Sequence, residues 1–196
     1  MYFLTIQLYD ESKLRSCGYQ FLLQRMIAMK TRIKLLLLAA FVLALAGCSS
    51  APNANNGDAA PDFELVDLDG NSHKLSDYEG QKVYIKFWAS WCSICLAGMG
   101  ELNELAGEEN DFVVLSIVSP SSNAEKNSAS FKKWFNGVEN TENVQVLLDE
   151  GGPVFEDYGV LAYPTSVYIG SDGVLVKSAP GHFSNEQIRE TFDTIQ

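Results

Sequence analysis

This sequence is poor in histidine and in charged residues, and it has no apolar run long enough to cross a membrane. Only two of its 196 residues are histidine. Charged residues make up 20% of the chain and form no long block of like charge, which excludes an intrinsically disordered protein and a basic nucleic-acid binder. The longest apolar run, Leu35 to Leu45, has eleven residues, and a membrane-spanning helix needs roughly 20. The remaining composition, with 46% hydrophobic residues, is that of one globular domain with a core.

Charge is divided unevenly along the chain. Acidic residues outnumber basic residues 25 to 14, for a formal charge of −11. The part up to Gly47 has six basic and two acidic residues, or +4, which leaves −15 for the part from Cys48 onward. Such an acidic domain repels phosphate backbones and anionic lipid headgroups. We therefore expect no nucleic-acid partner, and any attachment to a membrane must come from something other than the surface of this domain.

An export signal is laid out at the end of the basic part. It begins with three basic residues, Lys30, Arg32 and Lys34. The apolar run follows, and then small residues up to Gly47, which is the order of zones in a signal peptide. We therefore interpret residues 29–47 as a signal peptide. Residues 1–28 are interpreted as an upstream extension, because signal peptides typically have about 15–30 residues.

The end of this signal resembles the lipobox of bacterial lipoproteins. The resemblance is carried by Leu45-Ala46-Gly47-Cys48. It implies that Cys48 is lipidated and becomes the first residue of the mature chain, with an ordinary signal-peptidase site as the alternative. Lipid chains can anchor a protein because each buried methylene contributes about 0.8 kcal/mol. Residues 48–60 have mostly small and polar side chains and predict a flexible tether.

Residues 61–196 are expected to form the folded domain, in which β-rich runs alternate with helical patterns. The expected strands are 83–88, 112–118, 165–169 and 174–176. The expected helices are 93–106, 123–135 and 185–195, with a short helical turn at 154–158. Ser184 and Gln187 have the spacing of a capping box, and the turn at 171–173 predicts an antiparallel hairpin. The predicted fold class is α/β, with a central mixed sheet flanked by helices.

Two cysteines stand where the first expected strand runs into a helix. Cys92 falls at the start of that helix, where unpaired amides and the helix dipole stabilise a thiolate. Cys95 lies three residues later, on the same side of the helix. Such a dithiol can attack a disulfide through Cys92 and be resolved by Cys95, which forms a Cys92–Cys95 disulfide.

Two other interpretations of this pair are weaker. A structural zinc site needs four ligands, and the mature chain adds only Cys48, His73 and His182, none of them in a second paired spacing. A purely structural disulfide is compatible with export. However, a bridge that closes so small a loop contributes little stability. Redox chemistry therefore remains the favoured interpretation.

Three stretches of the domain resemble the thioredoxin family. They are FWASWCSIC at residues 87–95, GVLAYPT at residues 159–165 and APDFEL at residues 60–65. The first is similar to the family's active site and the second to its cis-proline loop, while the third resembles the membrane-tethered TlpA/ResA-like branch. Within that branch, a lipoprotein is similar to the extracellular thioredoxins of Gram-positive bacteria, the Etrx type. The resemblance implies a thioredoxin-like fold with an N-terminal β extension.

The resemblance also implies roles for individual residues. Cys92 is the nucleophile and Cys95 the resolving cysteine of a redox-active disulfide. Pro164 follows a cis peptide bond, which turns the chain sharply and frees backbone groups of the preceding residue for a bound substrate. The implied substrate-binding residues are Trp91, Ser93, Ile94, Tyr163 and Pro164. No cofactor or metal is implied, and we expect a monomer.

The sequence departs from the family pattern around the cysteines. A proline is usual between them, where Ile94 stands here, and Gly100 replaces a proline that kinks the helix. Thioredoxin has a buried aspartate where this chain has Lys86, and the ResA branch has a glutamate where this chain has Gly98. The usual carboxylates that would take the proton of the resolving cysteine are therefore missing.

This leaves the proton acceptor of Cys95 open, with Glu101, Glu64 or water as candidates. Lys86 could lower the thiol pKa if it lay beneath the cysteines. We expect it instead to extend outward along a sheet edge or to carry its ammonium to solvent. Trp88 is expected in the core and Trp91 beside the active site.

The charge pattern favours a reductase over an oxidant. No cation lies between the cysteines, and a strongly acidic domain disfavours a further anion, so the dithiol should be relatively reducing. Outside the cytoplasm, a reductase needs an electron donor that spans the membrane. The resemblance implies a CcdA-type donor and a surface methionine sulfoxide reductase as acceptor, at the outer face of the cytoplasmic membrane. The alternatives are cytochrome c maturation, and general oxidation or isomerisation of disulfides in exported proteins.

Overall fold

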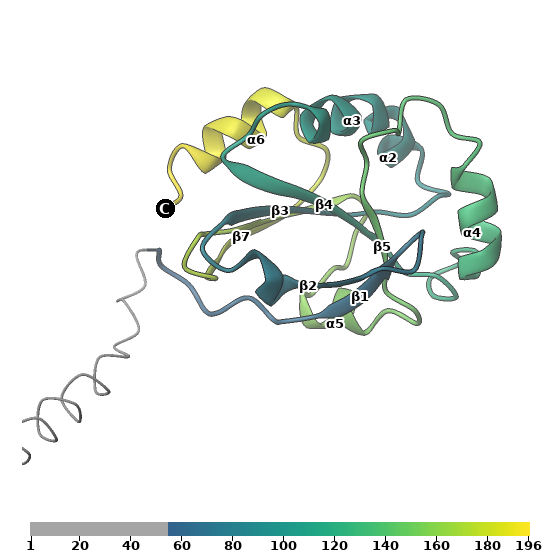
Figure 1. The fold of residues 1–196 in the computed structure, drawn as a ribbon, viewed down its shortest axis with the longest axis horizontal. Helices are drawn as coiled ribbons and strands as arrows, with labels where there is room; N and C mark the ends of the chain where they lie inside the picture. Colours follow the sequence, from purple (N-terminus) through teal and green to yellow (C-terminus); the bar gives the residue numbers. More distant parts are fainter. Residues whose placement is uncertain (1–54) are drawn as a thin grey trace, which may run out of the picture. The chain divides into compact units, whose positions relative to one another are not determined.

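A seven-stranded mixed sheet forms the centre of residues 55–196, the part of the chain described by this computed structural model (Figure 1). The strands are β1 (Glu64–Asp67), β2 (Ser72–Lys74), β3 (Lys82–Phe87), β4 (Phe112–Val118), β5 (Val146–Leu148), β6 (Thr165–Ile169) and β7 (Leu175–Pro180). Their order across the sheet is β2-β1-β5-β4-β3-β6-β7. The pairs β3–β4 and β4–β5 are parallel and all others are antiparallel. The predicted mixed α/β sheet is confirmed.

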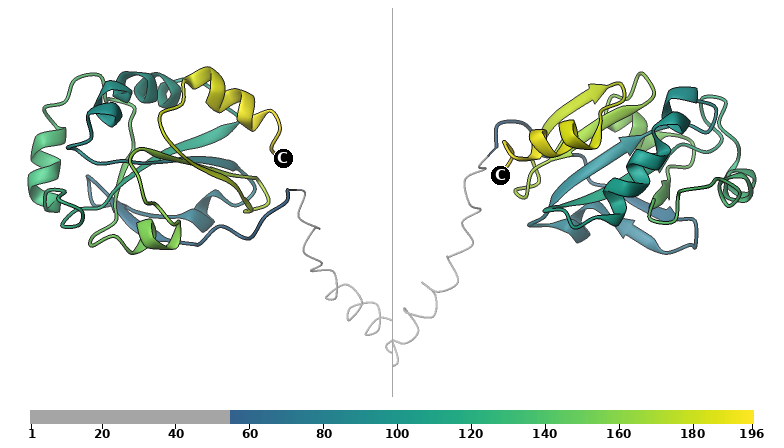
Figure 2. Two further views of the ribbon diagram at one scale, coloured as in Figure 1. Left: turned by 180° about the vertical axis from the view of Figure 1, so that it is seen from behind. Right: turned by 90° about the horizontal axis from the view of Figure 1, so that it is seen from above.

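Helices cover both faces of this sheet. They are η1 (Leu75–Tyr78), α2 (Ser93–Ala97), α3 (Met99–Gly107), α4 (Ser128–Phe135), α5 (Pro153–Asp157) and α6 (Asn185–Phe192). Figures 1 and 2 show α2, α3 and α6 on one side of the sheet and α5 on the other. The short β-rich runs of β3 and β6 are therefore buried on both faces, as such sequences predict.

Alternate residues of β3 supply two separate core clusters. Tyr84 and Trp88 pack with side chains from α3, α4 and α6 in one cluster, which also contains both active-site cysteines. Ile85 and Phe87 pack with α5 in the other cluster. This division follows from the period of two in a strand, which sends successive side chains to opposite faces.

Three helices differ clearly from their predicted bounds, and one of them, α6, ends at Phe192 where residue 195 was predicted. The segment 93–106 was expected to form one helix but is divided at Gly98, which ends α2 and begins α3. The helix expected at 123–135 begins only at Ser128, with Asn127 as its cap. The residues before it form a loop in which Asn123 and Ala124 have positive φ, a conformation that a helix does not contain. The capping box of Ser184 and Gln187 at α6 is present as predicted.

The described domain begins to make ordered contacts earlier than residue 61. Ala60 N–H donates to Gly173 O at 2.9 Å, and Leu175 N–H donates to Asp58 O at 2.9 Å. Ala59 also forms an isolated antiparallel bridge with Val174. Residues 55–60, which the sequence assigns to the tether, thus lie along the β6–β7 hairpin.

The remaining N-terminal predictions fall on residues that the structure does not describe. The upstream extension, the signal peptide, Cys48 and the first part of the tether all lie outside the described residues. Between residues 55 and 196, no helix is both long enough and apolar enough to cross a bilayer.

Candidate active site

The two cysteines lie at the carboxyl end of β3 and are joined by a disulfide. Their Cα atoms are 5.2 Å apart. Cys92 is the N-cap residue of α2, and its Sγ accepts a hydrogen bond from the backbone N–H of Cys95 at 3.2 Å. The exposed fraction is 8% for Cys92 and 0% for Cys95. Cys92 is therefore the sulfur that a partner can reach, as expected of the attacking thiol.

The second part of the site is the loop before β6. The Tyr163–Pro164 peptide bond is cis, as the sequence predicts. The Tyr163 ring packs edge-on against Trp91, with ring centroids 5.4 Å apart. Asn123 Nδ2 donates a hydrogen bond to the Tyr163 hydroxyl at 3.0 Å. The structure thus brings Tyr163, Pro164 and Trp91 together beside the cysteine turn.

A groove of about 660 Å³ runs beside this loop. It is lined by Trp91, Asn123, Ala124, Val160, Leu161, Ala162 and Tyr163. Trp91 is 51% exposed and Leu161 is 97% exposed. Ile94 lies between the cysteines and is also exposed, as is Ser93. This apolar surface, with Cys92 nearby, suits an extended segment of a partner protein, because exposed apolar patches mark interaction sites. Trp88, by contrast, is fully buried, as predicted.

A buried carboxylate braces the turn that precedes Cys92. Glu125 accepts hydrogen bonds from both the backbone N–H and the hydroxyl of Ser90, the latter at 2.6 Å. Lys126 Nζ in turn donates to Ser90 Oγ at 2.6 Å. The loop that carries Glu125 thus contacts the cysteine turn, and through Asn123 it also contacts Tyr163. Sequence reasoning missed Glu125, because no local pattern links it to a serine 35 residues earlier in the chain.

The prediction that Lys86 lies on a sheet edge or reaches solvent is wrong. Lys86 lies in β3, which pairs with β4 on one side and β6 on the other. Its exposed fraction is 3%. Burial lowers its pKa to about 8, and the nearby negative charge of Glu101 acts in the opposite direction. The chain therefore places a lysine in the interior, on the central strand that leads to the cysteines.

The two carboxylate candidates for the proton of Cys95 lie in different places. Glu101 is in the first turn of α3, and His182 Nε2 lies 3.1 Å from its carboxylate. Glu64 is on β1, which β5 and β4 separate from β3, and it pairs with Lys74 at the surface. The structure therefore keeps Glu101 close to the active-site helices and places Glu64 away from them.

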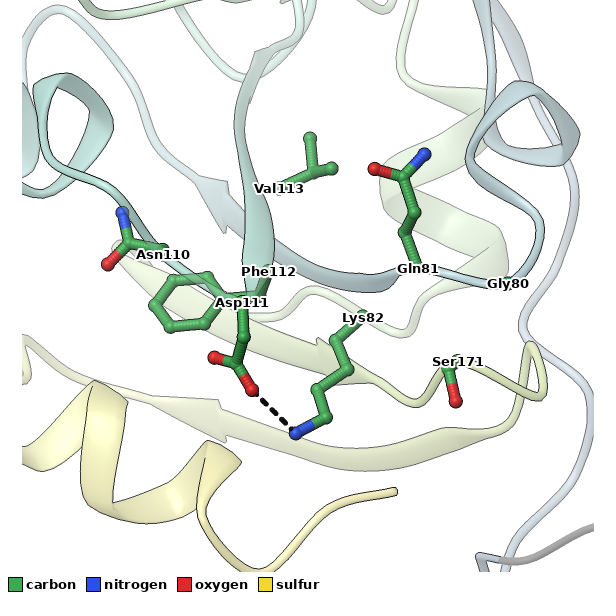
Figure 3. Close-up of a pocket in the computed structure, with 8 residues that line it drawn as sticks. All are labelled: Gly80, Gln81, Lys82, Asn110, Asp111, Phe112, Val113 and Ser171. Carbon is green, nitrogen blue, oxygen red and sulfur yellow. Dashed lines mark hydrogen bonds and ion pairs between the residues drawn. The ribbon is translucent and has the colours of Figure 1, made fainter.

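A second hollow, of about 390 Å³, lies at the opposite end of the sheet. Figure 3 shows Lys82 of β3 and Asp111 before β4 on its wall, joined by an ion pair of 2.8 Å. In α/β sheets, ligands bind outside the carboxyl ends of parallel strands, whereas this hollow lies at the amino ends of β3 and β4. We therefore assign the chemistry to the cysteine end.

Neither histidine lies in a cluster with metal-ligand geometry. His73 is on β2 and pairs with Asp67 at 3.0 Å. His182 lies between β7 and α6. Within residues 55–196 there is no group of three or more His, Cys, Asp or Glu side chains that could hold a metal ion. These residues give no support to a zinc site built on Cys92 and Cys95.

Known proteins are similar in sequence to most of this domain. The Redoxin family model matches residues 55–195. The chain is 30% identical over 179 residues to the thiol-disulfide oxidoreductase ResA of Geobacillus thermodenitrificans, a match that covers 88% of this chain and 98% of ResA. It is also 45% identical over 129 residues to an uncharacterized protein of Haemophilus influenzae, covering 65% of this chain and 82% of that protein.

A solved structure agrees with these relatives. The exposed lipoprotein thioredoxin Etrx1 of Streptococcus pneumoniae strain TIGR4 is 46% identical to this chain, with a TM-score of 0.66. The match covers 69% of this chain and 100% of the Etrx1 structure. Together with a bonded Cys-X-X-Cys pair at the end of a central strand, these findings show that the chain belongs to the Redoxin family, as a thiol-disulfide oxidoreductase of the ResA-like branch with a thioredoxin-like fold.

Proposed function

We propose that this protein is a membrane-anchored reductase of protein disulfides at the outer face of the cytoplasmic membrane. It takes electrons from a CcdA-type membrane protein and passes them to a surface methionine sulfoxide reductase. The observation that carries the proposal is the pairing of a reachable Cys92 with a fully buried Cys95 beside an apolar groove. This arrangement lets a partner disulfide meet one sulfur while the other stays protected.

The reaction has two steps. In the first, the Cys92 thiolate attacks one sulfur of the partner's disulfide, and a mixed disulfide forms while the other partner sulfur leaves as a thiolate. In the second, the Cys95 thiolate attacks Cys92 Sγ, and the second partner sulfur leaves. Each departing thiolate takes up a proton. The partner gains two electrons, and the Cys92–Cys95 disulfide seen in the structure is the product state.

The surroundings of the cysteines support the reducing direction. The residues between the cysteines, Ser93 and Ile94, carry no charge, and the domain has a large excess of acidic residues. Because these two residues add no charge that would stabilise a thiolate, the dithiol should give up its electrons more readily than a pair with a cation between its cysteines. Trp91, Ile94 and Leu161 offer an apolar contact surface, which can hold a partner segment beside the cis-proline loop.

The anchoring part of the proposal relies on Cys48. The lipobox-like sequence Leu45-Ala46-Gly47-Cys48 stands seven residues before the described part of the chain. Etrx1, with 46% identity, is described as an exposed lipoprotein. Labelling cells with a clickable fatty acid should mark this protein, and Cys48→Ala should abolish the label. An unlabelled wild-type protein would contradict the anchor.

A mixed-disulfide trap tests the partners. In the native organism, Cys95→Ser leaves Cys92 able to attack but removes the resolving thiol, so partners remain attached and can be identified by mass spectrometry. The double variant Cys92→Ser/Cys95→Ser is the matched control, because it keeps the groove but lacks both thiols. We expect a methionine sulfoxide reductase and a CcdA-type protein in the trap and neither in the control.

Other captured proteins would redirect the proposal. The 30% identity with ResA makes cytochrome c maturation the second candidate, and capture of apocytochrome c would favour it. A broad set of exported proteins would instead indicate general disulfide correction or oxidation. Either result would overturn the methionine sulfoxide reductase assignment while leaving the exchange chemistry in place.

A further inference from the structure

Lys86 shares a face of the sheet with the redox cysteines. It follows Tyr84 at the strand period of two, so both side chains leave β3 on the same face, and Trp88, directly after the strand, continues the alternation. Tyr84 and Trp88 belong to the core cluster that also contains Cys92 and Cys95. The Lys86 side chain is therefore enclosed on the active-site face of the sheet.

The surroundings of Lys86 provide no direct anion. Its neighbours across the sheet are Ser116 on β4 and Ser166 on β6. Ser116 Oγ donates to Gln145 O at 2.9 Å, and Ser166 Oγ is bonded to the Tyr84 hydroxyl at 2.8 Å. Among the described residues, none forms a hydrogen bond or an ion pair with the Lys86 ammonium. Burying a cation without such a partner costs free energy of folding. The burial of Lys86 therefore indicates a role in function.

Two ionisable side chains, Glu101 and His182, are associated with this lysine. Glu101 in the first turn of α3 is the group whose charge favours the ammonium form of Lys86. His182 in turn holds Glu101, at 3.1 Å. Gly98 makes room for this histidine, because a Cβ at position 98 would lie 2.5 Å from the ring atom Cε1. The absence of a side chain at position 98, three residues after Cys95, thus leaves space for the His182 imidazole that orients Glu101.

We propose that Lys86 is the positioning residue that stabilises the thiolate of the reduced Cys92–Cys95 pair and so sets its redox equilibrium. The inference relies on the dithiol exchange of the proposed function but on neither named partner. When Cys95 loses its proton to solvent before it attacks Cys92 Sγ, a negative charge forms on the buried sulfur. An ammonium on the same face lowers the free energy of that charge in an environment of low dielectric constant.

The surroundings of Lys86 contain several other titratable groups. The titratable side chains that face it or join it through Glu101 are Tyr84 on β3, Tyr168 on β6, Cys95 on α2, Glu101 on α3 and His182 before α6. Burial raises the pKa of both tyrosines, so they remain neutral. Burial lowers the pKa of Lys86 to about 8 in this disulfide form, and the stabilising effect should decline once the pH exceeds the higher pKa that Lys86 has beside a thiolate.

The variant Lys86→Met removes the charge and keeps an unbranched apolar side chain. In full-length protein equilibrated with glutathione buffers at pH 7, we expect the equilibrium to shift about tenfold toward the disulfide form, or about 30 mV more reducing. In a Cys92→Ser background, the pKa of Cys95 should rise when Lys86→Met is added. Both differences should shrink once the pH exceeds that higher pKa of Lys86.

The matched control is Lys82→Met on the same strand. Lys82 leaves β3 on the same face but at the far end, where it pairs with Asp111 (Figure 3). This variant removes the same charge from the domain, and it should leave the glutathione equilibrium unchanged. Equal shifts in the two variants would overturn the inference, since they would reflect net charge alone.

A measurement on the unaltered active site keeps the inference testable if Lys86→Met does not fold. Coupling between charges is reciprocal, so the pKa of Lys86 should be higher in the reduced protein than in the oxidised protein. NMR of lysine labelled at ¹³Cε can follow this titration. An identical Lys86 pKa in both states would contradict the inference. Because the trap identifies partners and these titrations do not, the failure of one proposal is distinguishable from the failure of the other.

Discussion

The two faces of the central sheet receive alternate side chains of β3 and differ in what they enclose besides apolar side chains. Ile85 and Phe87 of β3 face α5, in a cluster of aliphatic and aromatic side chains. Tyr84 and Lys86 face the other way, toward the helices that carry the cysteines. Both faces carry a hydrophobic core cluster. Only the second face also encloses a lysine and a redox pair.

Residues of β3 that mainly contribute to stability therefore alternate with residues on the face where the redox chemistry takes place. Apolar burial contributes about 25 cal/mol per Å² and is the main source of folding free energy. Buried charge is costly and is retained mostly where it serves a function. We therefore expect substitutions on the α5 face to change stability alone, and substitutions of Lys86 or the cysteines on the other face to change redox behaviour.

The largest effect is expected from Cys92→Ser on the cysteine face. Without the attacking thiol, the reduction of insulin disulfides in the presence of dithiothreitol should fall to the uncatalysed rate. The melting temperature should change little, because the lost disulfide closes a small loop. Ser178→Ala on the edge strand β7 is the control, because Ser178 is exposed and outside the site, and it should keep near-normal activity. Catalysis by Cys92→Ser above the uncatalysed rate would contradict the assigned role.

A large effect of the opposite kind is expected from Ile85→Ala on the α5 face. Ile85 is fully buried, and removing its side chain should cost about 2–5 kcal/mol in the free energy of unfolding. Urea denaturation measures this loss, and the glutathione equilibrium of the folded protein should stay unchanged. Val66→Ala on β1 removes methyl groups from an exposed side chain and should cost at most about 0.5 kcal/mol. A clear redox shift in Ile85→Ala would break the separation of the two faces.

An intermediate effect is expected from Glu125→Gln, which tests the brace on the cysteine turn. Glutamine can accept from only one of the two Ser90 donors and leaves Lys126 without its neighbouring anion. The expected loss is about 1–3 kcal/mol of stability, with slower reduction of a protein disulfide. Glu150→Gln is the control, since Glu150 is an exposed loop residue that accepts from Ser121. Similar losses in both variants would argue against a brace.

The smallest effect is expected from Asp67→Asn, on β1, which lies next to the edge strand β2. Burial raises the pKa of Asp67, but hydrogen bonds from Asn71, His73 and backbone amides outweigh it, so the pKa lies well below its usual range. A depressed carboxyl pKa stabilises the fold above the unfolded-state value of about 4 and loses that contribution as the pH falls below it. Denaturant titrations between pH 7 and pH 3 should therefore show a weaker pH dependence for Asp67→Asn. Parallel profiles for the variant and the wild-type protein would contradict this contribution.

Local sequence patterns predicted the parts of this site that depend on neighbours in the chain. The Cys92–Cys95 spacing after a β-rich run, the cis bond before Pro164 and the capping box of α6 all follow from residues close in sequence. The mixed sheet followed from runs that suit burial on both faces. These features need no knowledge of tertiary contacts.

The remaining features depend on contacts between distant segments. Lysine is rarely buried, so Lys86 was expected at the surface, and only the pairing of β3 with both β4 and β6 encloses it. The brace joins Glu125 to Ser90 across 35 residues. Similarly, the helix is divided at Gly98, where His182 packs although it is far away in the sequence. No periodicity in the sequence carries that information.

The reduction potential of the Cys92–Cys95 pair tests the central claim most directly. Full-length protein, equilibrated with glutathione buffers at pH 7 and quantified by thiol alkylation, gives this value. A protein that supplies electrons to partner disulfides should have a potential more negative than about −200 mV, below that of protein disulfide isomerase at about −180 mV. A potential near that of DsbA, about −120 mV, would show a strong oxidant and contradict the account.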